Sequence, residues 1–274
     1  MEPPQQHLPA GRKAAILQQV NTLGQVTVST LADRFDVSTD TIRRDLDQLD
    51  TEGALIRTHG GAMSTFAVPW HDTQVDDRSR LQPMQKQAIA VTAAELVQDG
   101  SVLFVNGGST ILAFARELGS KRELIIATNN LRLPSELNPD SYRDLYVFGG
   151  HVRTSGQVTV GPIAFASAIS GVENDIHADL AIIAVGAFDP DGYSTSNLDE
   201  AAMLTQMAER ARRVAVLADS SKSDKRLFAS IGPLEMADYL ITDTEPDAPL
   251  LEALTAAHVR ILTPQQTTTR RRSS

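Results

Sequence analysis

The N-terminal part of this chain is built around Val37–Leu49, VSTDTIRRDLDQL. Ile42, Leu46 and Leu49 recur at intervals of four and three residues, which predicts a helix with one buried face. Ser38 stands just before that helix, where its hydroxyl can accept a backbone N–H of the first turn. The stretch therefore predicts a capped amphipathic helix that carries two adjacent arginines on its polar side.

Two further helices are predicted before this one. Residues 12–23 repeat apolar side chains at helical spacing, and Ser29 is placed to cap a second, shorter helix. Asp36 and Val37 form a tight turn between the second helix and the third. Two helices joined in this way form a helix-turn-helix arrangement, whose second helix enters the major groove of DNA with its N-terminal end first.

Residues 54–62 (ALIRTHGGA) alternate apolar and polar side chains and end in a glycine pair, which predicts a hairpin wing beside that helix. Arginine forks to guanine edges, and hydroxyl groups hold phosphate oxygens. Two arginines on an isolated helix more commonly form a solvated charged face, and a winged helix can instead bind protein. The predicted DNA-binding residues are Ser38, Thr39, Asp40, Thr41, Arg43, Arg44, Arg57 and His59.

The charge balance limits how such a domain binds DNA. The chain of 274 residues has a formal net charge of -9, and residues 1–62 carry six Lys and Arg side chains against eight Asp and Glu. Because phosphate contacts need basic side chains, a non-specific electrostatic binder is not expected. A specific reader needs a local basic patch, and its modest affinity per subunit favours a homo-oligomer, either a dimer or a tetramer.

Composition argues against several other classes of protein. The chain has no cysteine, and its six histidines lie far apart without a helical i, i+4 pair, so neither thiol chemistry nor a local metal site is indicated. No stretch approaches about 18 uninterrupted apolar residues, and the N-terminus lacks the organisation of a signal peptide. We expect a cytoplasmic protein that uses no cofactor and does not enter the membrane.

Residues 63–84 lack a sustained period and predict a linker, and from residue 85 onward strands and helices alternate. Apolar strands such as Val102–Val105 and Leu180–Val185 predict an α/β domain with a mostly parallel sheet buried on both faces. A helix is expected over Pro162–Ile169. The predicted organisation is a winged helix-turn-helix domain (8–62), the linker (63–84), the α/β domain (85–263) and a disordered tail (264–274).

Ligands of such sheets bind at the carboxyl ends of the strands. Polar and glycine-rich turns recur there in this sequence, and Asn106–Thr110 (NGGST) opens a helix whose N-terminal amides and hydroxyls suit a phosphate. Such a turn also caps ordinary helices, so by itself it does not decide between the two roles. The candidate ligand residues in these turns are Asn106, Gly107, Gly108, Ser109, Thr110, Thr128, Asn129, Gly149, Gly150, Gly186, Asp219 and Lys222.

TIRRDL at 41–46, followed by GALIRTHGGA at 53–62, resembles the DNA-binding domain of the DeoR family of bacterial transcriptional regulators. From about residue 86 to residue 243, the turns together resemble the effector domain of that family. The family domain shares its fold with ribose-5-phosphate isomerase and CoA transferases, and it senses phosphorylated sugars or polyols. The resemblance implies a repressor of sugar or polyol metabolism genes that releases double-stranded operator DNA when it binds such an effector.

The resemblance also implies roles for single residues. The family shows D-x-G-T-T where this chain has Asn106–Thr110, so a hydroxyl is kept at Ser109 while the carboxylate that could hold a sugar hydroxyl is lost. Asp219 and Lys222 match the family's D-x-S-K motif, which implies that they hold a sugar hydroxyl and the phosphate, respectively. Asn197 and Glu200 lie in a stretch similar to the family loop that faces the ligand.

Other interpretations of these residues stay open. Glu200 can be an ordinary acid in the first turn of a helix, and Lys222 can be a solvated loop lysine. An alternative function is a sugar-phosphate isomerase in which Glu200 or Asp219 is the base and Lys222 stabilises charge, although the appended winged helix disfavours it. A third possibility is an adaptor whose winged helix binds protein.

Overall fold

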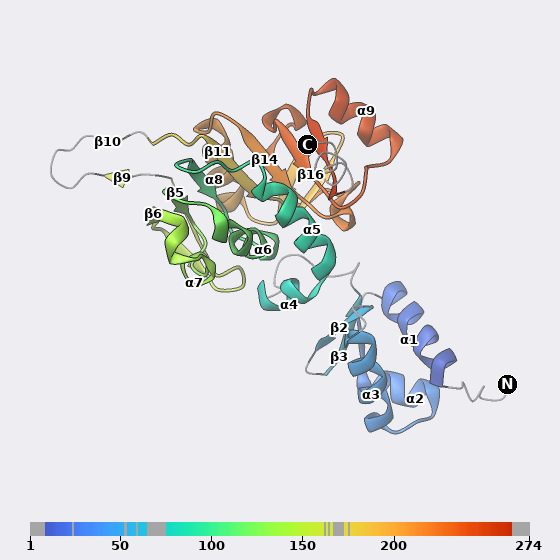
Figure 1. Cartoon of the computed structure of the whole chain (residues 1–274). Coiled ribbons are helices and arrows are strands. Elements are labelled where there is room, and N and C mark those ends of the chain that lie inside the picture. Colours follow the sequence, from blue (N-terminus) through green and yellow to red (C-terminus); the bar gives the residue numbers. More distant parts are fainter. Residues whose placement is uncertain are drawn as a thin grey trace. The chain divides into compact units, whose positions relative to one another are not determined.

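The computed structural model describes residues 9–23, 25–51, 54–58, 60–64, 75–161, 163, 165–166, 173–174 and 176–264. The chain forms two compact units, residues 1–73 with 80–82 and residues 74–79 with 83–274, and each is described by itself (Figure 1). Among the helices in the described ranges, none is both long enough and apolar enough to cross a membrane.

The first unit is a winged helix-turn-helix, as predicted. Its elements are α1 (Pro9–Leu23), β1 (Gln25–Thr27), α2 (Val28–Phe35), α3 (Thr39–Thr51), β2 (Leu55–Thr58) and β3 (Gly61–Ser64). Strands β2 and β3 form the predicted antiparallel hairpin, and β1 pairs with the other edge of β3. Ile16 from α1, Leu31 from α2 and Ile42 from α3 are fully buried in one core, so the three helices are fixed against one another.

Caps set the bounds of α2 and α3. The backbone N–H of Thr41 donates to Ser38 Oγ at 3.2 Å, which confirms the predicted cap of α3. The predicted cap of α2 was wrong, because Thr27 Oγ1 accepts the backbone N–H of Thr30 at 3.1 Å, while Ser29 lies inside the helix. Thr27 takes this role because it ends β1 in an extended conformation. Asp36 closes α2 in the left-handed conformation, with φ 50°, and so turns the chain toward α3.

The second unit is organised on a seven-stranded sheet. Its order is β17-β16-β14-β11-β4-β5-β6, and every neighbouring pair is parallel, which confirms the predicted class of sheet. These strands are β4 (Val102–Val105), β5 (Leu124–Thr128), β6 (Tyr142–Val147), β11 (Leu180–Ala184), β14 (Val214–Leu217), β16 (Tyr239–Ile241) and β17 (Arg260–Leu262).

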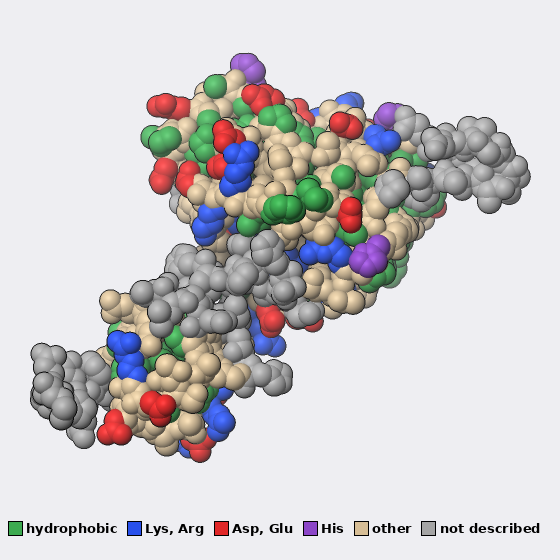
Figure 2. Space-filling model, turned by 180° about the vertical axis from the view of Figure 1, so that it is seen from behind, with side chains coloured by type: hydrophobic (Ala, Val, Ile, Leu, Met, Phe, Trp, Pro, Cys, Tyr) green, Lys and Arg blue, Asp and Glu red, His purple; other side chains and the backbone are tan. Residues whose placement is uncertain are grey.

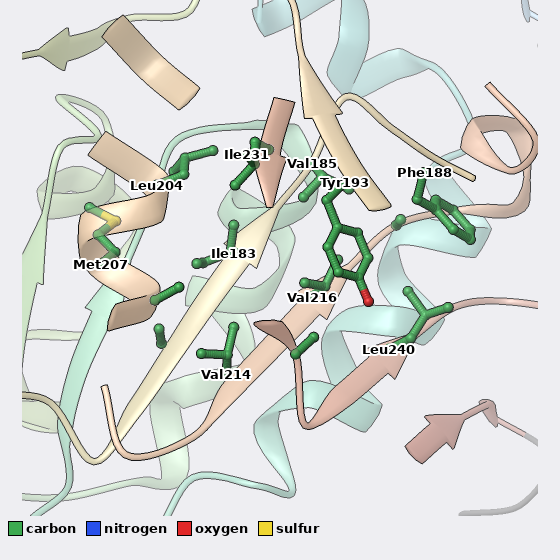
Figure 3. Packing of buried hydrophobic residues seen from close by; sticks show 14 of the residues in the cluster. Ile183, Val185, Phe188, Tyr193, Leu204, Met207, Val214, Val216, Ile231 and Leu240 are labelled. Atoms are coloured by element: carbon green, nitrogen blue, oxygen red, sulfur yellow. The ribbon is translucent and has the colours of Figure 1, made fainter. Parts of the chain in front are cut away.

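Helices cover both faces of this sheet. They are α5 (Pro83–Ala94), α6 (Ser109–Glu117), α7 (Leu133–Glu136), α8 (Leu198–Glu209) and α9 (Ala248–Ala256), and the helix α4 (Val75–Arg80) precedes them in the chain. Alternate side chains of β11 divide between two cores: Ile182 packs in the cluster that includes α5 and α6, and Ile183 in the cluster that includes α8 and α9. Figure 3 shows the second cluster, in which Leu204 and Met207 of α8 lie beside Ile183.

Short strands that the sequence analysis did not predict surround the sheet. They are β7 (His151–Arg153), β8 (Val158–Val160), β9 (Phe165–Ala166), β10 (Glu173–Asn174), β12 (Ala187–Asp189), β13 (Gly192–Thr195) and β15 (Ala229–Gly232). The helix predicted over Pro162–Ile169 was wrong at Phe165 and Ala166, which pair antiparallel with β10. That partner is a separate segment of chain, so local periodicity carried no sign of it.

Residues 75–80, which fall within the predicted linker, form α4, and this helix belongs largely to the second unit. Val75 is buried, and its backbone N–H donates to Ser155 O at 2.9 Å. Residues 65–74 of the predicted linker and residues 265–274 of the predicted tail lie outside the described residues.

Candidate functional site

The N-terminal half of α3 presents the predicted DNA-reading residues. Ser38, Thr39, Asp40, Arg43 and Arg44 are exposed, and Thr41 is half-buried. The guanidinium of Arg43 donates to Asp40 Oδ1 at 2.8 Å, and 56% of the Arg43 side chain is exposed. An exposed pair one turn apart contributes little to stability, so Arg43 is oriented but still available to a base edge or a phosphate.

Arg57, predicted to contact DNA from the wing, is largely engaged within the domain. Its Nε donates to Asp47 Oδ1 at 2.9 Å and a terminal guanidinium nitrogen donates to Gly61 O at 2.9 Å. Its backbone N–H donates to Asp50 Oδ1 at 2.9 Å. The bonds to Asp47 and Asp50 tie the wing to α3, and the bond to Gly61 O joins the two strands of the wing, so Arg57 fixes the hairpin beside the helix. His59, the other predicted wing residue, lies outside the described residues.

The acidic residue of the TIRRDL motif has a structural role that the sequence analysis missed. Asp45 is buried and accepts a hydrogen bond from Arg12 Nε at 2.6 Å, with 8% and 11% of the two side chains exposed. This ion pair joins α1 to α3 beneath the exposed arginines. Basic and acidic side chains are intermixed on the visible face of the first unit (Figure 2).

The turn after β4 begins with a side chain committed to the sheet. Asn106 Nδ2 donates to Ala184 O at 2.8 Å, and Asn106 Oδ1 accepts the backbone N–H of Ala184 at 2.8 Å. A carboxylate could not donate the first bond, so asparagine fits this position where the family shows an aspartate. Asn106 therefore joins β4 to β11, and its amide is used within the fold rather than directed at a ligand.

The remaining residues of that turn lead into α6. Gly107 is so close to Val158 of β8 that any side chain would collide, and Gly108 has φ 128°, which only glycine adopts readily. Ser109 is the first residue of α6. Thr110 Oγ1 is buried and has no hydrogen-bond partner among the described residues, which leaves one hydroxyl at this helix end for a ligand.

The turn after β5 contributes a second such atom. Asn129 Nδ2 donates to Thr159 O at 2.8 Å, whereas Asn129 Oδ1 is buried without a hydrogen-bond partner in the described part of the chain. Thr128 Oγ1 accepts the backbone N–H of Asn130 at 3.0 Å and shapes the turn.

Two of the three glycines predicted at the other turns permit close approach of neighbouring chain. Gly150 has φ 138° and lies against the backbone of Val160, while Gly186 lies against Leu227. Gly149 has open space around its Cα. Gly150 and Gly186 therefore shape the turns after β6 and β11.

Asp219 and Lys222, at the carboxyl end of β14, lie in a buried charged cluster. Asp219 Oδ2 is 3.7 Å from Lys86 Nζ of α5, and Asp219 Oδ1 accepts the backbone N–H of Ser221 at 3.2 Å. Lys222 Nζ donates to Val185 O at 2.8 Å. At most 7% of Asp219, Lys86 or Lys222 is exposed, so the interpretation of Lys222 as a solvated loop lysine was wrong.

Glu200 adds a second carboxylate close to this cluster. Its Oε2 accepts hydrogen bonds from Arg153 at 2.9 Å and from Thr195 Oγ1 at 3.0 Å. Asn197 caps α8, because its Oδ1 accepts the backbone N–H of Glu200 at 2.9 Å. Glu200 is near enough to Lys222 to favour the charged form of that lysine. The fold thus brings together two carboxylates, Glu200 and Asp219, that lie on different elements.

Burial and charge shift the pKa values of this cluster. Burial lowers the pKa of Lys86 to about 8, although attraction to Asp219 opposes the shift, and burial also lowers the pKa of Lys222. Burial alone would raise the pKa of Asp219, but Lys222 and Lys86 outweigh it and the net pKa is lowered. At neutral pH the Asp219 carboxylate is therefore ionised, and Lys86, beside it, is largely protonated.

Basic groups outnumber acidic ones in what we call the cation cluster, defined as Arg78, Lys86, Arg153, Lys222, Asp219 and Glu200. The sequence analysis missed Lys86, Arg153 and Arg78 of α4. For Lys86 a signal existed, because it shares the buried stripe of α5 with Ile89 and Ala93. In the part of the chain that the structure describes, no three His, Cys, Asp or Glu side chains are grouped to hold a metal. The excess of basic over acidic groups suits an anion.

Two family models match this chain. The DeoR-like helix-turn-helix domain matches residues 12–66, and the DeoR C terminal sensor domain matches residues 81–244. Among solved structures, a ribose 5-phosphate isomerase from Plasmodium falciparum aligns with a TM-score of 0.36 and 12% identity, covering 50% of this chain and 52% of that one. That likeness is too distant to support a functional argument.

Named regulators are similar over nearly the whole chain. The HTH-type transcriptional regulator GlpR of Haloferax volcanii is 34% identical, covering 93% of this chain and 98% of that protein. The HTH-type transcriptional repressor CsqR of Escherichia coli is 32% identical, with coverage of 93% and 95%. The glycerol-3-phosphate regulon repressor of Escherichia coli is 31% identical, with coverage of 91% and 97%. These relatives are regulators, which sets the isomerase alternative aside, and the chain belongs to the DeoR family of transcriptional regulators.

Proposed function

We propose that this protein represses genes of sugar or polyol metabolism, and that a phosphorylated sugar or polyol bound in its second unit relieves the repression. The observation that carries the proposal is the cation cluster at the carboxyl edge of the sheet, in a chain that also has an exposed reading helix. A buried surplus of positive charge is costly unless an anion offsets it, so its presence supports a negatively charged ligand.

The site divides into parts suited to different ends of such a ligand. Lys86, Lys222 and the N-terminal end of α6, with the free hydroxyl of Thr110, suit the phosphate. Asp219 and the unpartnered Oδ1 of Asn129 can accept hydrogen bonds from sugar or polyol hydroxyls. One relative is named a glycerol-3-phosphate regulon repressor, which makes sn-glycerol 3-phosphate a rational first probe.

Control of DNA binding requires that the ligand prefer one of two arrangements of the protein. We propose that reading helices from at least two subunits engage the operator, because a slightly acidic unit binds DNA weakly alone. The effector then favours an arrangement in which the two reading helices do not fit one operator.

Fluorescence anisotropy tests the proposal with DNA from the promoter region of the protein's own gene. We expect this DNA to bind more tightly than shuffled DNA of the same composition, and one phosphorylated sugar or polyol to weaken that binding at least tenfold. The unphosphorylated counterpart is the control and should have no effect. Equal affinity for the promoter and the shuffled DNA would refute the repressor hypothesis.

Effector binding should weaken as the pH rises through about 8. Lys86 has a pKa of about 8 in the protein without ligand, so above that pH it is neutral and no longer attracts a phosphate dianion. Isothermal titration calorimetry at pH 7 and pH 9 should show a loss of several-fold in affinity, and Lys86→Met should bind weakly at both pH values. An affinity of the wild-type protein that is unchanged across this range would place Lys86 outside the site.

A further inference from the structure

Arg78 lies on α4, between the two parts of the chain that the family models match, residues 12–66 and 81–244. The base of α4 is attached to the second unit: Val75 is buried and bonded to Ser155 O, and Asp76 pairs with Arg132. The chain that leads from the DNA-binding unit therefore enters the second unit at α4, before the matched sensor domain begins.

The side chain of Arg78 lies close to the other members of the cation cluster. Burial lowers its pKa, attraction to Glu200 opposes that shift, and repulsion from Arg153 adds to it. Arg78 is also close enough to Lys86 and Lys222 to contribute to lowering the pKa of both, after the larger effects of burial and of Asp219. One guanidinium nitrogen lies over Gly156, in the turn between β7 and β8. Arg78 thus faces groups from α5, α8, η3 (Ser220–Lys222) and the β7–β8 hairpin.

Neither carboxylate of the cluster completes the hydrogen bonding of Arg78. Glu200 Oε2 already accepts bonds from Arg153 and Thr195, and Asp219 is occupied by Lys86 and Ser221. The Nε of Arg78 is buried without a hydrogen-bond partner among the described residues. A buried, charged donor without a partner is costly, and an oxygen of a phosphate dianion would satisfy it while offsetting the surplus charge.

We propose that Arg78 is a ligand-binding residue supplied by the connecting segment, so that the effector itself holds α4 against the second unit. The inference rests on the proposed function, because it assigns Arg78 to the same anion site. Without ligand, α4 is held at its base, and Arg78 is attracted by Glu200 but repelled by its basic neighbours. With ligand, Arg78 gains an acceptor and α4 is held along its length. Binding of the effector therefore acts directly on α4, the helix through which the chain passes from the DNA-binding unit into the second unit.

Hydrogen–deuterium exchange of the full chain tests this proposal without DNA. The probes are inorganic phosphate and sn-glycerol 3-phosphate, compared with glycerol. In the wild-type protein we expect either anion to slow exchange at least tenfold in α4 and at the N-terminal end of α6. Arg78→Met should keep the slowing at α6, at a higher ligand concentration, and lose it at α4. Arg78→Lys should recover part of it.

Arg80→Met is the matched control, because Arg80 is an exposed arginine on the same helix. It should behave like the wild-type protein. At saturating ligand, Arg78→Met should keep its operator DNA while the wild-type protein and Arg80→Met release theirs. Slowing at α6 without slowing at α4 in the wild-type protein would overturn the role of Arg78 and leave the proposed function standing. Absence of slowing anywhere with either anion would overturn both.

Discussion

Arg43→Ala is expected to weaken operator binding about a hundredfold while leaving the fold intact. Arg43 is exposed on the N-terminal half of α3, and its one described contact is the pair with Asp40. A forked contact of arginine with a base is worth roughly 1–3 kcal/mol, and the operator complex that we propose, with two reading helices, loses two of them. Because each 1.4 kcal/mol is about tenfold in affinity, the combined loss corresponds to about a hundredfold or more.

Arg143→Ala provides a close control for that measurement. Arg143 lies in the second unit, pairs with the adjacent Asp144, and has 57% of its side chain exposed, against 56% for Arg43. Both variants remove one exposed, paired arginine and the same charge. Anisotropy titrations should show the large loss for Arg43→Ala alone, with thermal unfolding unchanged in both. Equal losses in the two variants would mean that overall charge, rather than contact by α3, determines affinity.

Asp45→Ala should destabilise the first unit far more than any exposed substitution on the same helix. Its removal leaves the guanidinium of Arg12 buried without its partner, and breaking a buried pair on one side costs about 3–5 kcal/mol. In a unit of this size, that loss lowers the melting temperature by more than about 10 °C. Calorimetry should show the transition of the first unit moving down while the transition of the second unit stays in place.

Two further variants identify the cause of that loss. Asp47 also pairs with an arginine, Arg57, but 64% of its side chain is exposed, so Asp47→Ala should cost less than about 1 kcal/mol. Replacing both members of the buried pair, as Arg12→Met with Asp45→Leu, should recover most of the stability, because no unpaired charge stays buried. If Asp45→Ala were no worse than Asp47→Ala, the buried pair would have no special role.

The sequence was most informative where one local pattern determines one element. Val102–Val105 was predicted with the bounds that β4 has, and Leu180–Val185 ends one residue beyond β11, because a short apolar run between polar turns has few alternatives inside an α/β domain. The β7–β8 hairpin and the β12-β13-β15 sheet were missed, since each strand has only three or four residues and depends on partners distant in the sequence. Tertiary pairing, which local propensity does not encode, decided those segments.

The sequence likewise predicted one part of the candidate site and missed another. The turns after β4, β5 and β14 were found because glycine and hydroxyl residues follow apolar strands at the carboxyl edge of the sheet, where ligands of such folds bind. Lys86 was overlooked although its place on an apolar stripe marks it as buried. Arg78 and Arg153 stand in no sequence pattern that predicts a site, because only the folded structure brings them close to Glu200. Asn106, which stands in a ligand motif, instead completes the sheet.

The order of elements along the chain also affects synthesis. The described helices and strands of the DNA-binding unit end at Ser64, so they can fold soon after they leave the ribosome. The cation cluster draws on residues from Arg78 to Lys222, so it cannot assemble until most of the second unit has been translated. Each new molecule therefore has a complete α3 before it has the complete site that we propose for the effector, and premature termination in this interval would yield fragments that lack this site.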